Sequence, residues 1–306
     1  MDLIVNIAIG IIVAATPLVF AAIGELVVEK SGVLNLGVEG MMIVGAIAAF
    51  AAVVQTGSAL AGVLAAVVCG ALMALLFAVL TQTLLANQVA TGLALTLFGL
   101  GLAALLGQSY SGQSAPAFPK LNIPGLSDVP VLGPLLFRHD YLVYLSLAVV
   151  AFVAWFFRRS RTGLIIRAIG ENHDAAHAIG YRVVAYRYAT LVFGGACAGL
   201  GGAYLSIVQT PLWVENMTAG RGWIALALVV FAAWKPWRAL FGAYLFGGIT
   251  IVQLHSQALG LKLEPQLLAM LPYLATIAVL TIISLDRTKA RLNAPACLGQ
   301  TFFAST

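Results

Sequence analysis

Residues 167–183, RAIGENHDAAHAIGYRV, form a polar and mostly basic stretch between two long apolar runs. A loop of this charge between two membrane spans is expected on the cytoplasmic side, where Lys and Arg accumulate. The middle of the stretch predicts a short helix, with Asn172 as its cap, Asp174 at its positive end and Gly180 at its close. A short helix on the cytoplasmic face would offer a docking point for a soluble partner protein.

The rest of the chain is strongly apolar. Of its 306 residues, 61% are hydrophobic and 9% are charged, and the mean hydropathy is +1.01. A soluble domain carries about 25% charged residues, so this chain has too few charges to cover a soluble surface. The net charge of +5 is concentrated in a few loops. Membrane orientation explains that pattern better than nucleic-acid binding does.

Apolar runs long enough to cross a bilayer recur along the chain, since a span needs about 20 residues. They predict an all-α polytopic membrane bundle of about 8–10 transmembrane helices. The runs lie at roughly 3–23, 38–56, 59–84, 89–107, 140–157, 188–209, 222–234, 239–259 and 266–285. Run 222–234 is short, which predicts a tilted or partly re-entrant helix. Small residues four apart, such as Gly195 and Gly199, predict close helix packing or a contact that slides during gating.

Loop charge predicts the orientation of the bundle. Loop 158–187 holds six Arg against two carboxylates, and the turn 235–238 is also basic. The tail is basic too, with Arg287, Lys289 and Arg291. Counting spans places all three segments on the cytoplasmic side, and places loop 108–139 and the N-terminus outside. We therefore predict one transmembrane domain over residues 1–290 and a C-terminal tail over residues 291–306.

Segment 29–42, EKSGVLNLGVEGMM, adds carboxylates, a Lys and an Asn to this apolar sequence, and Glu25 precedes it. Ionisable groups at membrane depth usually face a cavity or pair with one another. Broken backbone at that depth lines a cavity or is buried in protein. The segment is either a cytoplasmic turn with solvated charges or a broken pore-lining segment. In the second case, Asn35 and Glu39 lie near a path across the membrane.

Other polar residues near span ends extend this candidate path. They are Gln88, Thr91, Trp213 and Asn216. The alternatives are hydrogen bonds between helices for the amides and an interfacial anchor for the tryptophan.

The sequence predicts no catalytic residue and no metal site. Residues 24–31, GELVVEKS, nearly match the phosphate loop GxxxxGK[ST], but Glu29 replaces the second glycine and would repel phosphate. His173 and His177 are four apart, a spacing that can bind metal, yet two histidines alone make an incomplete site. We expect no cofactor in this chain and no ATP hydrolysis by it.

Three separated segments carry a family resemblance: SGVLNLGVEGMM (31–42), RAIGENHDAAHAIGYRV (167–183) and NMTAGRGWIALALVVFAAWKP (216–236). Together they resemble the membrane permease subunits of bacterial ATP-binding-cassette importers. The closest group is the branched-chain amino acid and simple-sugar permease superfamily. Within it, GVLNLGVEGMM and TAGRG look most like the nucleoside permeases served by basic-membrane-protein-type lipoproteins. The resemblance runs from about residue 10 to 290, and the last residues match nothing.

The resemblance implies a multi-pass permease of the bacterial inner membrane that forms the translocation path for nucleosides or related small polar solutes. It implies a second permease subunit, cytoplasmic ATP-binding subunits that hold ATP and Mg, and an extracytoplasmic substrate-binding lipoprotein. Loop 158–187 would be the coupling loop. Its candidate docking residues are Arg167, Glu171, Asn172, Asp174, Ala175, Ala176 and Gly180.

Other functions remain open on the sequence. The cargo of the same machine could be a branched-chain amino acid or a simple sugar. An ion-coupled secondary transporter would use Glu25, Glu29 and Glu39 as relays. A membrane scaffold would transport nothing.

Overall fold

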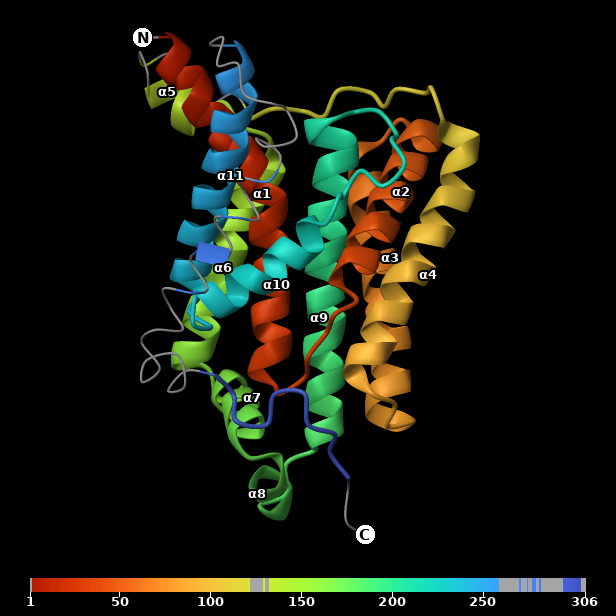
Figure 1. Cartoon of the computed structure of the whole chain (residues 1–306), viewed down its shortest axis with the longest axis vertical. Helices are drawn as coiled ribbons and strands as arrows, with labels where there is room; N and C mark the ends of the chain where they lie inside the picture. The colour runs from red at the N-terminus through yellow and green to blue at the C-terminus, as the bar shows by residue number, and fades with distance from the viewer. Residues whose placement is uncertain are drawn as a thin grey trace.

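The computed structural model describes residues 2–121, 129, 132–258, 270, 274, 277, 278, 281 and 294–303. Over this part of the chain the protein folds into helices, joined by turns and two isolated β-bridges. The main helices lie side by side along the long axis (Figure 1). The predicted all-α membrane bundle is therefore confirmed.

The helices follow one another closely along the chain. They are α1 (Asp2–Lys30), α2 (Val38–Thr56), α3 (Ala59–Ala78), α4 (Gln88–Gly107), α5 (Leu132–Leu136), α6 (Tyr141–Arg159), α7 (Arg161–Glu171), α8 (His173–Ala178), α9 (Val183–Ala203), α10 (Arg221–Phe231) and α11 (Pro236–Ala258). Short π-helical segments, η1 (Val79–Thr83) and η3 (Tyr204–Gln209), extend α3 and α9, and a 3-10 turn, η2 (Gln108–Tyr110), extends α4.

Seven of the described helices are long and apolar enough to cross a membrane. Helix α10 is shorter, with 11 residues, and crosses the middle of the bundle obliquely (Figure 1). This agrees with the tilted or re-entrant helix predicted for 222–234. The predicted span 266–285 lies largely outside the described residues.

Two predicted span boundaries are wrong for the same reason. Helix α1 continues past residue 23 to Lys30, and α9 begins at Val183 rather than at residue 188. Both extensions contain charged side chains, which the hydropathy rule excludes from a span. In the structure Glu25, Glu29 and Arg187 are buried and hydrogen-bonded inside the protein, so they do not end the helices.

The two ends of the bundle match the orientation that loop charge predicts. Figure 1 shows the N-terminus at one end, and α7, α8 and residues 294–303 at the other. The turn at Lys235 lies beside Lys30, Arg158 and Arg167 around one cavity, so it shares the end of the coupling loop. By the positive-inside rule this is the cytoplasmic end. Arg287, Lys289 and Arg291 lie outside the described residues.

Helix α9 is the central helix, and its small residues let its neighbours approach closely. A Cβ added to Gly199 would lie 2.1 Å from the carbonyl oxygen of Ala66 in α3, and one on Gly202 would lie 1.9 Å from that of Met42 in α2. On the α1 side, a Cβ on Gly24 would lie 2.8 Å from the carbonyl oxygen of Gly194. Backbones in direct contact are what small residues four apart predict.

Candidate functional site

Loop 158–187, which we call the coupling loop after its predicted role, folds as two short helices at the basic end of the bundle. Ser160 caps α7 by accepting from the Gly163 N–H at 2.9 Å, and Asn172 caps α8 by accepting from the Ala175 N–H at 2.9 Å. Gly180 follows α8 with φ +94°, a backbone angle that glycine adopts without strain. The short helix predicted from 167–183, with its cap at Asn172, is therefore confirmed.

The candidate docking residues divide into an exposed set and one buried member. Those on the surface are Arg167, Glu171, Asn172, Asp174, Ala175 and Gly180. Ala176 faces inward and is 3% exposed, in a cluster with Ile169, Val183 and Phe302. Its methyl group packs α8 onto the protein, so Ala176 does not lie on the surface that a partner would meet.

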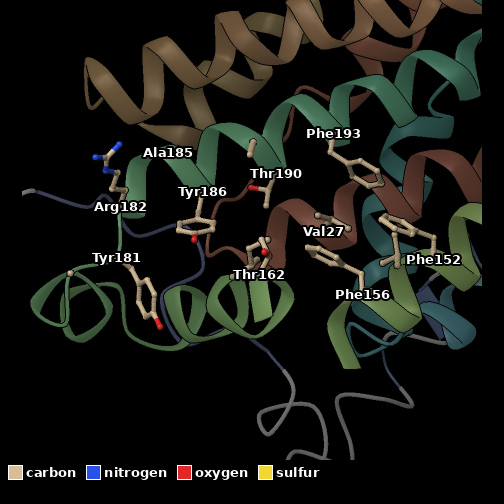
Figure 2. Close-up of a pocket in the computed structure, with 14 residues that line it drawn as sticks. Val27, Phe152, Phe156, Thr162, Tyr181, Arg182, Ala185, Tyr186, Thr190 and Phe193 are labelled. Carbon is tan, nitrogen blue, oxygen red and sulfur yellow. The ribbon is translucent and has the colours of Figure 1, made fainter. Parts of the chain in front are cut away.

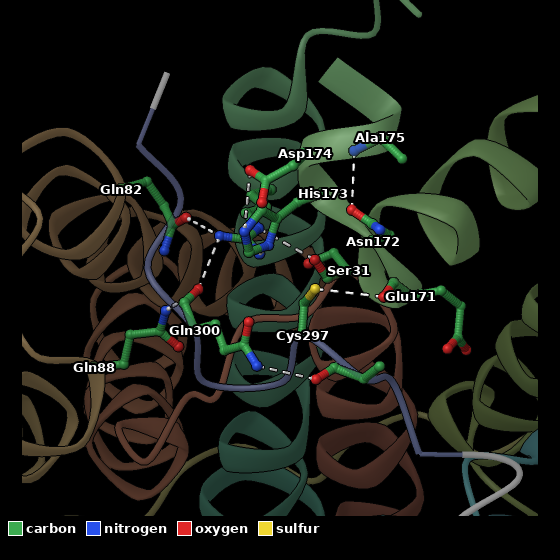
Figure 3. A network of polar contacts seen from close by, with 12 residues as sticks. Ser31, Gln82, Gln88, Glu171, Asn172, His173, Asp174, Ala175, Cys297 and Gln300 are labelled. Atoms are coloured by element: carbon green, nitrogen blue, oxygen red, sulfur yellow. Dashed lines mark hydrogen bonds and ion pairs between the residues drawn. The ribbon is translucent and has the colours of Figure 1, made fainter. Parts of the chain in front are cut away.

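Residues 294–303, which we call the C-terminal segment, run beneath the coupling loop. The Cys297 N–H donates to the Gly170 carbonyl at 2.9 Å, and the Gly299 N–H donates to the Gly32 carbonyl at 3.1 Å. The Cys297 thiol also contacts the Glu171 carbonyl, at 3.4 Å (Figure 3). The segment therefore bonds to the coupling loop on one side and to the residues after α1 on the other.

An aromatic contact completes this attachment. The buried ring of Phe302 lies edge-on to the rings of His173 and His177 in α8, with both centroid distances at 5.3 Å. The two histidines that suggested half of a metal site thus enclose a phenylalanine. His173 Nδ1 in addition lies 3.2 Å from Nη2 of Arg187.

Arg187 lies at the centre of this cytoplasmic network and is fully buried. The sequence counts it among the six Arg of the basic loop 158–187, whereas the structure places it within α9. Among the described residues, its guanidinium bonds to neutral groups: the Ser31 carbonyl at 3.2 Å, Gln82 Oε1 at 3.4 Å, the Gln300 carbonyl at 3.3 Å and His173 Nδ1 at 3.2 Å. A buried cation needs such partners, because leaving it without them is costly.

The same environment acts on His173. Its burial, together with the positive charge of Arg187, lowers the pKa of the imidazole below its usual value, against a smaller opposite effect of Asp174. A neutral imidazole is what the Arg187 contact requires, since Nδ1 can accept a hydrogen bond only when it carries no proton.

Glu25 and the carboxylates of segment 29–42 are buried in the protein. Glu25 accepts from the Asn35 backbone N–H at 3.3 Å and from its Nδ2 at 3.1 Å, and Asn35 Oδ1 accepts from the Gly37 N–H at 3.0 Å. Glu29 accepts from Trp234 Nε1 at 2.6 Å. These side chains are 1–2% exposed. The alternative of a cytoplasmic turn with solvated charges is therefore wrong.

Glu39 joins segment 29–42 to segment 216–236. Its carboxylate accepts from the N–H of Gly220 at 2.8 Å and from the N–H of Gly222 at 2.6 Å, at the start of α10. A helix N-terminus has unpaired N–H groups and a positive dipole end, and a carboxylate satisfies both. Gly220 has φ +82°, and a Cβ on Gly222 would lie 2.6 Å from the Glu39 Cα. The glycines of TAGRG therefore permit this contact.

The other path candidates lie in different surroundings. Gln88 is buried and accepts from the Leu34 N–H at 2.8 Å, whereas Thr91 is half-buried and Asn216 is exposed. Trp213 is 7% exposed and packs against Phe50, so it is an interior residue and not an interfacial anchor. Gln88 and Asn35 bond to the same broken segment, through Leu34 and Gly37, and Glu39 follows it.

A large apolar cavity opens between α1, α6, α7 and α9, near the coupling loop. Its volume is about 580 Å³, and its lining includes Phe152, Phe156, Tyr186 and Phe193. In Figure 2, Arg182 and Tyr181 lie at one end of the cavity and these phenylalanines at the other. No candidate of the translocation path lines this cavity. It is therefore separate from the predicted path.

Two features of the site escaped the sequence prediction. One is Arg187. Its helical spacing from Val183, Thr190 and Leu191, which are all buried on α9, was the signal that could have indicated its burial. The other is the C-terminal segment. Its apolar and small residues, such as Cys297 and Phe302, give no periodic pattern, so nothing in the sequence indicated where it packs.

Comparisons with known proteins show the family to which the chain belongs. Residues 7–280 match the family described as the permease component of branched-chain amino acid transport systems. A permease protein of Haloferax volcanii, whose name assigns it to a glucose ABC transporter, is 40% identical over 94% of each chain. A guanosine ABC transporter permease of Bacillus subtilis is 33% identical over 94% of this chain and 93% of its own. A nucleoside ABC transporter permease of Lactococcus lactis is 32% identical over 89% and 90%. The chain belongs to this family and is an ABC transporter permease, a multi-pass protein of the inner membrane.

Proposed function

We propose that this chain forms the translocation path of an ATP-driven importer for nucleosides or related small polar solutes. A second permease subunit completes the path, and a substrate-binding lipoprotein delivers the solute from outside. ATP-binding subunits dock on the exposed residues of the coupling loop and hold ATP and Mg²⁺. This chain contributes no catalytic group and no cofactor to that reaction.

The observation that carries the proposal is the attachment of the coupling loop. One face of α8 is exposed at the cytoplasmic end, and the residues beneath it are bonded to α9 and to the C-terminal segment. A Cβ on Gly170 would lie 2.3 Å from the Lys30 carbonyl oxygen, so α7 rests directly on the end of α1. A push on α8 by a docked subunit would therefore move these elements as one body.

The path would open by a rearrangement of the buried polar residues. Asn35, Glu39 and Gln88 are hydrogen-bonded within the chain in this conformation. Glu39 holds the short helix α10, and residues 32–37 hold the ends of α1 and α4. Movement of α10 away from Glu39 would expose these polar groups, together with Thr91 and Trp213, to a solute with hydroxyl and amide groups, and Asn216 is already exposed.

The names of two relatives, a guanosine permease and a nucleoside permease, support the nucleoside as cargo. The glucose assignment of the 40% identical relative favours a simple sugar as the second candidate. Nucleosides and sugars share a ring with several hydroxyl groups, which the same polar side chains would bind. A branched-chain amino acid lacks this ring.

The test is the ATPase activity of the reconstituted importer in proteoliposomes, with its binding protein, against guanosine, glucose and leucine. Stimulation by guanosine is the expected result, and stimulation by glucose alone would replace the nucleoside by a sugar. Collapse of the proton gradient with ATP maintained should leave uptake unchanged. Loss of uptake under that condition would instead favour an ion-coupled transporter.

A further inference from the structure

A second cavity, of about 490 Å³, opens at the cytoplasmic end and has a basic rim. Four segments meet around it: the end of α1, the end of α6, the middle of α7 and the turn between α10 and α11. Each contributes at least one cation, and the set is Lys30, Arg158, Arg167, Lys235 and Arg238. We call this cavity the basic pocket.

The floor of the basic pocket is apolar. Ala154, Phe157 and Trp234 line it, and all three are buried. Two features hold Trp234 in place. Its backbone is in the left-handed region with φ +54°, and its indole N–H donates to the buried Glu29 at 2.6 Å. The left-handed turn at Ala233 and Trp234 ends α10 and brings Lys235 and Arg238 to face the arginines of α6 and α7.

Positive charge dominates the rim. Among the residues that the structure describes, no carboxylate lies within 4.0 Å of the cationic nitrogens of Arg158, Arg167, Lys235 or Arg238. Glu29 and Glu171 are the acidic neighbours of Lys30. Beneath the floor, the carboxylate of Glu29 accepts the hydrogen bond from the indole N–H of Trp234. Like charges held around one cavity repel each other, and an anion in the cavity removes that repulsion.

We propose that the basic pocket binds the phosphate headgroup of an anionic phospholipid from the cytoplasmic leaflet. Guanidinium groups match phosphate oxygens in pairs, and basic pockets between helices at this side of a membrane bind phosphate headgroups. Trp237, which is 55% exposed, lies on the rim at the start of α11. An exposed tryptophan at a span end lies at headgroup depth. The apolar floor receives the glycerol end of the lipid, which a free phosphate ion does not have.

The bound lipid joins two parts of the protein that sequence separates. Arg167 belongs to the coupling loop, whereas Lys235 and Arg238 lie at the start of α11. A phosphate between them holds α7 against α11 at the point where the coupling loop meets the bundle.

The test uses the full chain, purified in detergent, and native mass spectrometry with phosphatidylglycerol, phosphatidylcholine or inorganic phosphate added. The variant carries Arg158→Gln, Lys235→Gln and Arg238→Gln. The matched control carries Arg159→Gln, Arg161→Gln and Arg182→Gln, which removes equal charge from exposed positions at the same end but outside the basic pocket. The single variant Lys235→Gln provides a second measurement if the triple variant does not fold.

We expect the wild-type chain to retain phosphatidylglycerol over phosphatidylcholine. The pocket variant should lose this preference by about tenfold or more, since one hydrogen bond to a charged group contributes about tenfold. The control, whose cations lie outside the basic pocket, should keep it. An equal loss in both triple variants would mean a general surface field and would overturn the site. Binding of inorganic phosphate by a wild-type chain that shows no preference for phosphatidylglycerol would overturn the lipid assignment.

Discussion

The guanidinium of Arg187 donates to the backbone carbonyl of Gln300, with 3.3 Å between Nη1 and the oxygen. The two residues are 113 positions apart. The bond attaches the C-terminal segment to the protein interior, since Arg187 is fully buried. The coupling loop therefore packs against α9, the residues after α1 and the C-terminal segment.

Phe302→Ala should loosen the coupling loop. Its buried ring fills the space between His173 and His177, and removal of a buried phenylalanine ring costs about 3 kcal/mol. Hydrogen exchange of the amides in α8 should become faster by about a hundredfold. The matched control is Phe303→Ala, because that ring is 68% exposed. Equal exchange in the two variants would show that the segment does not support the loop.

Acidification should weaken the contact between His173 and Arg187. The folded pKa of His173 is lowered, so the unfolded segment binds the proton more tightly than the folded one. The contribution of His173 to stability is therefore complete above its unfolded pKa of about 6.5 and declines as the pH falls toward the folded pKa. Local opening of α8, measured by hydrogen exchange between pH 7.5 and 5.5, should increase toward low pH. His173→Gln, which keeps an acceptor without titrating, should reduce this dependence.

Glu39→Gln should destabilise α10. The carboxylate accepts from two N–H groups, of Gly220 and Gly222, whereas an amide presents an acceptor to one and a donor to the other. A buried N–H left without a partner costs about 1–3 kcal/mol. The midpoint of thermal unfolding in detergent should fall. Glu215→Gln, at an exposed position before α10, is the control and should leave it unchanged.

Gly199→Ala should disrupt the contact of α9 with α3. The added methyl would lie 2.1 Å from the carbonyl oxygen of Ala66, a backbone atom that cannot yield without moving the helix. Overpacking of this kind costs about 1–3 kcal/mol or more, and monodisperse protein in detergent should be reduced. Gly101→Ala, where nothing lies within 4 Å of the added methyl, should be tolerated. Equal yields would contradict the close packing.

Glu171→Lys should uncouple transport and leave membrane insertion intact. Glu171 is exposed next to α8, so its reversal changes the docking surface without disturbing the core. Substrate-stimulated ATPase activity and uptake should both fall, while the amount of the chain in the membrane stays the same. Gly180→Arg should have the same effect, with added strain from φ +94° of about 1–2 kcal/mol. Unchanged uptake in both variants would rule out docking at this loop.

The sequence by itself determined the class of fold and predicted the orientation. Apolar runs of membrane length define the spans because each backbone group in lipid must be paired within its own helix. The basic loops define the cytoplasmic end, and the caps of α8 could be read directly because capping depends on residues only a few positions apart. Each of these features has a local cause.

Only the tertiary structure decided which charges are buried and what they bind. The sequence counts Arg187 as a loop charge and offers Glu39 as a path residue, but it does not indicate their partners. These are Gln300 and the glycines at 220 and 222, which are distant along the chain. The basic pocket also joins segments that no sequence pattern connects. Burial of a charge is favourable only when distant groups are brought around it, and that arrangement is a property of the whole packed bundle.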